Sequence, residues 1–110
     1  MAGIKSKKEI GALFKKGKRA SGKLLNVRYF LREEGRPRSL FVVSKKAGGA
    51  VKRNRIRRRI KEAWRKIRER ILPGSDLAFF PRDGAGEAKT NEFYCDMERI
   101  FKREKILDQK

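Results

Sequence analysis

Apolar residues near the start of the chain recur at helical spacing. Ile10, Leu13 and Phe14 fall at positions i, i+3 and i+4, so they share one face of a helix that we predict over residues 7–16. The sequence Ser6-Lys7-Lys8-Glu9 has the form of a capping box, which is typical of a helix N-terminus. A short amphipathic helix is therefore the first predicted element.

Apolar and polar residues then alternate, which predicts a strand over residues 24–32 after a basic connection at residues 18–23. One face of this strand is interpreted as core and carries Leu25, Val27, Tyr29 and Leu31. The opposite face carries a polar, a cationic and an aromatic residue, Asn26, Arg28 and Phe30. Such a row is what a platform for single-stranded RNA requires. A continuous apolar run at residues 40–43 predicts a second, more buried strand, antiparallel to the first.

The longest apolar stripe lies in the middle of the chain and predicts a helix over residues 53–72. The stripe is expected to be core and consists of Ile56, Ile60, Ala63, Trp64, Ile67 and Ile71. Residues 76–81 predict a third strand, so a βαβ unit is plausible. A last helix is predicted over residues 91–106, with Thr90 as its N-cap. Its apolar side carries Phe93, Met97, Ile100, Phe101 and Leu107.

Composition changes the picture from an ordinary small domain to a strongly cationic one. The chain has 110 residues, of which 38% are hydrophobic, so we expect one domain over residues 1–110 with a thin core. Lys and Arg number 32 and Asp and Glu 13, which gives a net charge of +19. A compact chain with this charge repels itself unless an anion neutralises it. A polyanionic partner is therefore favoured, nucleic acid first and an anionic membrane surface second.

The sequence lacks the residues of common enzyme chemistry. It has no His, its single Cys95 has no partner, and its acidic residues are scattered. Glu92 and Asp96 are interpreted as surface acids near a helix start, and Cys95 as structural. We therefore expect no catalytic and no metal-binding residues. No apolar run is long enough to span a membrane and no signal peptide is evident, so a cytoplasmic location is expected.

Basic residues concentrate on the predicted middle helix. Residues 51–70 contain 11 Lys or Arg, against two acidic residues. Lys52, Arg53 and Arg55 lie at the helix start, where the helix dipole disfavours cations. Arginine outnumbers lysine there, and its forked guanidinium suits phosphate oxygens. A merely solvated helix face does not explain this placement, so the segment indicates nucleic-acid binding, with phosphate near the free amides of the helix start.

A family resemblance lies in residues 44–64, which read SKKAGGAVKRNRIRRRIKEAW. This segment resembles the signature of the bacterial ribonuclease P protein subunit, S-K-K-x-G-x-A-V-x-R-N-R-I-K-R-x-x-R-x-x-F. The resemblance extends along nearly the whole chain, from Phe14-Lys15-x-Gly17 to Pro81-Arg82 and the final helix. It implies an α+β fold, an α-β-β-β-α-β-α two-layer sandwich with a mixed central sheet and an unusual left-handed βαβ crossover. That type of sandwich is also seen in a domain of a ribosomal protein.

The resemblance also implies a function. Proteins of this family bind a large catalytic RNA, and the complex removes the 5′ leader from precursor tRNA. The expected partners are therefore the ribonuclease P RNA and the precursor tRNA leader, with neither a membrane nor DNA. The RNA carries the active site and requires Mg²⁺, and no cofactor is expected to be bound tightly by the protein itself.

Two sets of site residues follow from the basic segment, the sheet face and the resemblance together. Contacts with the catalytic RNA are expected from Lys45, Lys46, Lys52, Arg53, Asn54, Arg55, Arg57, Arg58, Lys61 and Arg65. A cleft between the first helix and the sheet is expected to hold the single-stranded leader, and its residues are Ile10, Phe14, Asn26, Arg28 and Phe30.

The sequence departs from the family pattern in this cleft. Ile10 stands where the family usually has Phe, and Arg28 stands where some members have Tyr. The N-terminal basic stretch is also shortened, and Lys5, Lys7 and Lys8 replace only part of it. Weaker base stacking is therefore expected, with Arg28 supplying a charge contact or a guanidinium stack.

Two other function classes remain open at this stage. A ribosomal or general RNA-binding protein without a processing role would share the charge, although the ordered motif disfavours it. A membrane-surface or architectural DNA-binding protein ranks last, because Trp64 and the isoleucines of the basic helix are needed for the core.

Overall fold

The computed structural model describes residues 7–32 and 35–107, and the residues of the predicted capping box before residue 7 lie outside that part of the chain. Its helices and strands are α1 (Lys7–Lys16), β1 (Lys18–Ser21), β2 (Leu25–Leu31), β3 (Arg38–Phe41), α2 (Ala50–Ile67), β4 (Ser75–Pro81) and α3 (Thr90–Arg103). Short 3-10 turns lie at η1 (Lys45–Ala47), η2 (Arg68–Arg70) and η3 (Ala85–Glu87). The α-β-β-β-α-β-α order implied by the resemblance is confirmed.

The four strands form one mixed sheet in the order β1-β2-β4-β3. β2 pairs antiparallel with both β1 and β4, whereas β3 pairs parallel with β4. Parallel neighbours need a crossover, and α2 supplies it between β3 and β4, so the predicted βαβ unit is confirmed.

Two strand predictions are wrong. Residues 18–21 are not a connection but the edge strand β1, whose Ala20 is buried beside Val27 of β2. The strand near residues 40–43 is β3, which runs antiparallel to β2 as predicted but does not neighbour it, because β4 inserts between them. β4 takes this central place because its residues are apolar on both faces, as parallel or central strands usually are. β3 lies at the edge and is only half-buried, rather than more buried than β2.

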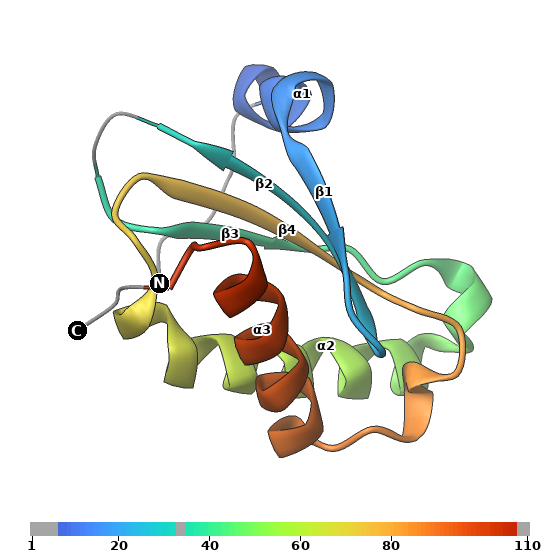
Figure 1. Cartoon of the computed structure of the whole chain (residues 1–110). Helices are drawn as coiled ribbons and strands as arrows, with labels where there is room; N and C mark the ends of the chain where they lie inside the picture. The colour runs from blue at the N-terminus through green and yellow to red at the C-terminus, as the bar shows by residue number, and fades with distance from the viewer. Residues whose placement is uncertain (1–6, 33–34, 108–110) are drawn as a thin grey trace.

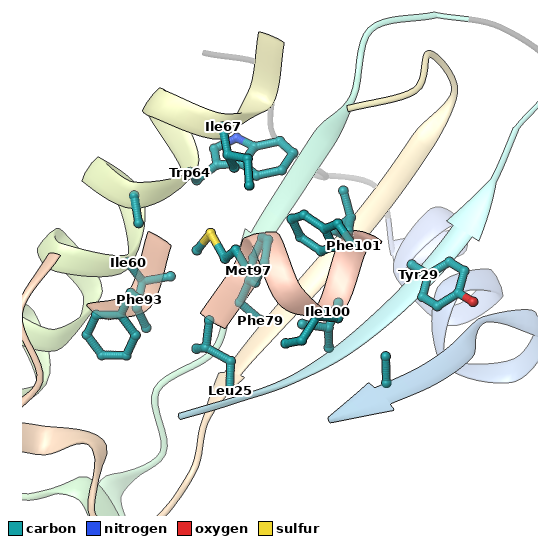
Figure 2. Packing of buried hydrophobic residues seen from close by; sticks show 14 of the residues in the cluster. Leu25, Tyr29, Ile60, Trp64, Ile67, Phe79, Phe93, Met97, Ile100 and Phe101 are labelled. Carbon is teal, nitrogen blue, oxygen red and sulfur yellow. The ribbon is translucent and has the colours of Figure 1, made fainter. Parts of the chain in front are cut away.

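The main core lies between the sheet and the pair of helices α2 and α3 (Figure 1). The predicted stripe of α2 is buried, including Ile60 and Trp64. Trp64 packs against Phe79 of β4 with ring centroids 5.5 Å apart, and Phe101 of α3 lies 6.1 Å from the same ring (Figure 2). Burying this apolar surface is the largest contribution to folding.

Among the described elements, α1 alone covers the other face of the sheet (Figure 1). Leu13 and Ala78 are buried there and form a small second cluster. α1 ends at Lys16, and the amide of the next residue, Gly17, donates to the Leu13 carbonyl at 2.9 Å. A Cβ at Gly17 would come within 2.2 Å of that carbonyl oxygen, so the junction between α1 and β1 requires glycine.

Several side chains differ from their predicted environments. Thr90 is the first helical residue of α3 rather than its cap, and the amide of Lys89 donates to Glu92 Oε1 at 3.0 Å. Leu31 is exposed because it lies at the end of β2. Cys95 is exposed, so it is not part of the core. Asp96 is fully buried rather than a surface acid.

Candidate nucleic-acid interface

One side of α2 carries a hollow of about 380 Å³ lined almost entirely by polar and charged side chains. We call it the basic groove, and its residues are Asn54, Arg57, Arg58, Lys61, Glu62 and Arg65. These positions recur at helical spacing, so consecutive turns of α2 present them side by side. Arg57 donates to Asn54 Oδ1 at 2.9 Å and Arg65 to Glu62 Oε1 at 2.8 Å, which holds the guanidinium groups over the helix surface. Five of the predicted RNA-binding residues thus lie together.

A second hollow of about 320 Å³ lies at the N-terminus of α2. We call it the helix-start pocket, and its charged residues are Lys46, Lys52, Arg82, Asp83 and Glu87. α2 begins after Gly49 with no side-chain cap and no acidic residue in its first turn, so the acids that line the pocket at its positive end, Asp83 and Glu87, come from the loop after β4. Amides and cations that converge in this way favour a phosphate group.

The Lys52 side chain crosses this pocket between two glycines. A Cβ at Gly48 would lie 2.8 Å from Lys52 Cδ, and a Cβ at Gly86 would lie 2.6 Å from Lys52 Cε. The glycines therefore leave room for the lysine stem to reach the pocket. Arg82, Asp83 and Glu87 were not predicted as site residues, because the loop after β4 lies far from α2 in the sequence.

The remaining predicted cations sit around the same helix start. Lys45 is exposed in η1, and Arg55 Nη2 lies 3.9 Å from Glu87 Oε1. The Nε atoms of Arg53 and Arg55 are buried without a hydrogen-bond acceptor in the described part of the protein. Buried donors normally have an acceptor, so both side chains are under-satisfied in the free protein.

A third hollow, of about 430 Å³, lies between the end of α1 and the sheet. We call it the sheet cleft, and it is lined by Phe14, Arg19, Ala20, Ser21, Asn26, Val27, Arg28 and Phe80. Arg28 Nη1 donates to the Phe14 carbonyl at 2.7 Å, and its guanidinium carbon lies 5.2 Å from the centre of the Phe14 ring. Phe14 also meets Phe80 edge to face at 5.9 Å. The cleft thus joins an exposed aromatic ring to fixed cations.

The structure brings together three of the five predicted cleft residues, Phe14, Asn26 and Arg28. Ile10 and Phe30 instead pack against Leu13 and Ala78 beneath α1, so they support the cleft from below without lining it. Phe80 was missed, although strand alternation from the buried Phe79 would have placed it on the opposite face. Arg19 and Ser21 were missed because β1 was not predicted.

No group of three or more Cys, Asp or Glu side chains within residues 7–32 and 35–107 lies close enough to hold a metal ion. Burial, together with a 2.7 Å hydrogen bond to Glu104 and its negative charge, raises the pKa of Tyr29 to about 12. Tyr29 therefore stays protonated at neutral pH and links β2 to the end of α3.

No helix in the described part of the chain is long and apolar enough to cross a membrane.

Comparison with known proteins gives one consistent result. The family model of ribonuclease P matches residues 2–105. The ribonuclease P protein component of Shouchella clausii is 33% identical over 106 residues, covering 94% of this chain and 86% of the relative. That of Clostridioides difficile is 34% identical over 105 residues, covering 94% and 92%.

Solved structures agree with the sequence comparisons. The RNase P protein of Staphylococcus aureus superposes with a TM-score of 0.84 at 28% identity, covering 98% of this chain and 99% of that one. The RNase P protein of Thermotoga maritima shares the fold, with a TM-score of 0.82 over 94% of this chain and 97% of that one. The family match, the relatives and the fold together show that this chain belongs to the ribonuclease P protein family.

Proposed function

We propose that this protein is the protein subunit of a bacterial ribonuclease P, which assists removal of the 5′ leader from precursor tRNA. Membership of the family supports the role in tRNA processing. The observation that carries the proposal is the combination of two cationic hollows on α2 with an aromatic and cationic cleft on the sheet. Two separate surfaces suit a protein that binds a structured RNA and a single strand together.

The basic groove and the helix-start pocket are assigned to the catalytic RNA. Arg57 and Arg58 present guanidinium forks, which suit the paired oxygens of a phosphate. Each phosphate contact releases counterions from the RNA, so binding by this surface depends steeply on salt. Structured RNA is read through its backbone and shape, which a row of arginines on a rigid helix can follow.

The sheet cleft is assigned to the single-stranded leader. Phe14 is 38% exposed, so its ring is accessible for a base to stack on. Arg28 is held against Phe14, and we assign its guanidinium to the phosphate that follows that base. Asn26 adds a side-chain amide that can donate hydrogen bonds to the leader and accept them from it.

The chemistry is assigned to the RNA and its Mg²⁺ ions. The protein contributes by placing cations beside the RNA phosphates near the active centre. These cations lower the repulsion between the phosphates. Mg²⁺ binding by the RNA then requires a lower metal concentration, while the cleft adds leader contacts to those made by the tRNA body.

Reconstitution tests this function directly. We expect the protein to stimulate precursor tRNA cleavage by a bacterial ribonuclease P RNA at low Mg²⁺, where the RNA alone is slow. Cleavage is followed by the release of the leader on a gel. No stimulation over RNA alone, together with tight binding to ribosomal RNA, would instead identify a general RNA-binding protein.

A further inference from the structure

Asp96 is a fully buried carboxylate in the middle of α3. Three consecutive backbone amides of the turn between β1 and β2 donate to it: Lys23 at 2.9 Å, Leu24 at 2.9 Å and Leu25 at 3.0 Å. Arg99 donates to the same group at 3.0 Å. A buried charge is tolerated only with such a full set of partners, so the carboxylate and the turn are built for each other.

The turn is closed on its other sides as well. A Cβ at Gly22 would lie 2.4 Å from Asp96 Oδ2, so glycine lets the backbone approach the carboxylate. Arg103 of α3 donates to the Ser21 carbonyl at 2.7 Å, and Arg82 donates to the Gly22 carbonyl at 2.9 Å. The turn is thus held by side chains from α3 and from the end of β4.

The balance of forces on Asp96 keeps it ionised. Burial by itself would raise its pKa, but the amides of Leu24 and Lys23, the Arg99 guanidinium and the amide of Leu25 outweigh burial and hold the pKa below its ordinary value. The charge that attracts the amides is therefore present at neutral pH.

This turn sets the position of one wall of the sheet cleft. β1 is a four-residue edge strand whose one partner among the described strands is β2, and Ser21 pairs with Asn26 beside the turn. Ser21, Asn26 and Arg19 are exposed residues of the cleft wall, whereas the side chain of Ala20 is buried in the main core. A shift of one residue in this register would exchange the two faces of β1 and remove Arg19 from the cleft.

We propose that Asp96 is a positioning residue for the sheet cleft, because it holds the β1–β2 turn in the register that presents Arg19 and Ser21 to the leader. The inference rests on the proposed function of the cleft. Asp96 touches no RNA itself. Its effect reaches the leader through the hairpin, so the helix α3 contributes to leader binding from the opposite side of the sheet.

The test measures leader-dependent affinity in the reconstituted complex of protein and ribonuclease P RNA. The dissociation constant is determined for a precursor tRNA with a multi-nucleotide leader and for the same tRNA with a single-nucleotide leader. The ratio of the two constants isolates the contribution of the cleft. For wild-type protein a ratio of one would overturn the assignment of the leader to the cleft, before any variant is compared.

Asp96→Asn is the principal variant, because it keeps the size of the side chain but removes the charge and one acceptor oxygen. We expect the leader-dependent ratio to fall about fivefold or more, the lower end of typical coupling between separate sites. Affinity for the RNA subunit is expected to stay at the wild-type value. Faster hydrogen exchange is expected at the amides of Lys23, Leu24 and Leu25, with α2 unchanged.

Glu92→Gln is the matched control, since it removes one negative charge from the same helix at an exposed position that does not touch the turn. Its ratio is expected to equal that of wild type. Gly22→Ala provides a second variant. It keeps the Asp96 carboxylate but adds a Cβ on the turn that would clash with it, so the turn must move away. If Asp96→Asn loses its folded circular dichroism signal, the leader-dependent ratio of Gly22→Ala tests the proposal in its place.

Three results would overturn the proposal. The first is a wild-type ratio in folded Asp96→Asn or in folded Gly22→Ala. The second is an equal loss of affinity for both substrates and for the RNA subunit, which would indicate a general loss of stability. The third is failure of both variants to fold, which would make Asp96 a residue of the whole fold rather than of the cleft.

Discussion

At the scale of single residues, one turn of α2 contains both a residue that packs in the core and a cation that faces the solvent. Ile60 is fully buried against the sheet, whereas Arg58, two positions before it, is exposed in the basic groove. Apolar burial stabilises the helix in place, so the cations on its outer face are not needed for folding. Arg53 even lies in the first turn of α2, where the helix dipole disfavours a cation, and Arg55 follows in the second turn.

Replacement of Arg53 or Arg55 by Ala is expected to weaken RNA binding with little loss of stability. Each lost phosphate contact should reduce the slope of log Kd against log salt by about 0.7 to 0.9. Binding titrations over a range of salt concentrations measure this slope, and urea unfolding measures stability.

Lys66→Ala is the control for these variants, because Lys66 is an exposed cation in the last turn of α2, far along the helix from Arg53 and Arg55, and is not among the predicted RNA-binding residues. It is expected to leave the slope nearly unchanged. Unfolding of Arg53→Ala at moderate salt would contradict the placement of this residue in the interface.

At the scale of elements, the junction between α1 and β1 sets the direction in which α1 lies across the sheet. The Gly17 amide closes α1 by bonding to Leu13, and β1 begins at the next residue. Phe14 lies one turn before this junction and reaches both Arg28 and Phe80. The direction of α1, and with it the aromatic side of the sheet cleft, therefore depends on one tight connection.

Gly17→Ala is expected to destabilise the protein by about 1–3 kcal/mol, because the added Cβ meets backbone oxygens that cannot move away freely. Those oxygens belong to Leu13 at 2.2 Å and Tyr29 at 3.0 Å. The free energy of unfolding in urea measures the loss.

Gly11→Ala supplies the matched control within the same helix. A Cβ at Gly11 has no neighbour within 4 Å, so the substitution is expected to stabilise α1 by up to about 1 kcal/mol through helix propensity alone. Equal effects of the two substitutions would show that the junction at Gly17 does not constrain α1.

At the scale of the whole molecule, a net charge of +19 acts against a compact state. The structure gathers much of that charge on α2, which contains one acidic residue, Glu62, and around the helix-start pocket, where Lys46, Lys52 and Arg82 lie with Asp83 and Glu87. Repulsion within these surfaces is relieved when anions bind there. Anion binding to the folded state then stabilises folding by mass action.

Sulfate is therefore expected to increase the folded fraction of the free protein at low ionic strength. Circular dichroism with and without sulfate measures this fraction, and sodium chloride at the same ionic strength is the control for simple screening. Sulfate is expected to act more strongly than chloride because its oxygens resemble those of the phosphates proposed to bind at these sites. An equal folded signal in all three conditions would contradict this expectation.

Local pattern in the sequence was enough for the elements whose formation depends on nearby residues. The bounds of α1, the buried stripe of α2 and the two faces of β2 follow from spacings of two to four residues. The basic segment at residues 44–64 is also contiguous, so both its charge and its family likeness could be read directly.

Only the tertiary structure decided which distant segments meet. It inserted β4 between β2 and β3, made an edge strand of residues 18–21, placed Phe80 in the sheet cleft and buried Asp96 against a turn more than 70 positions away in sequence. The spacing of residues along the chain does not predict such contacts between distant segments. They are selected by the joint burial of apolar faces and by the need of each buried polar group for a partner.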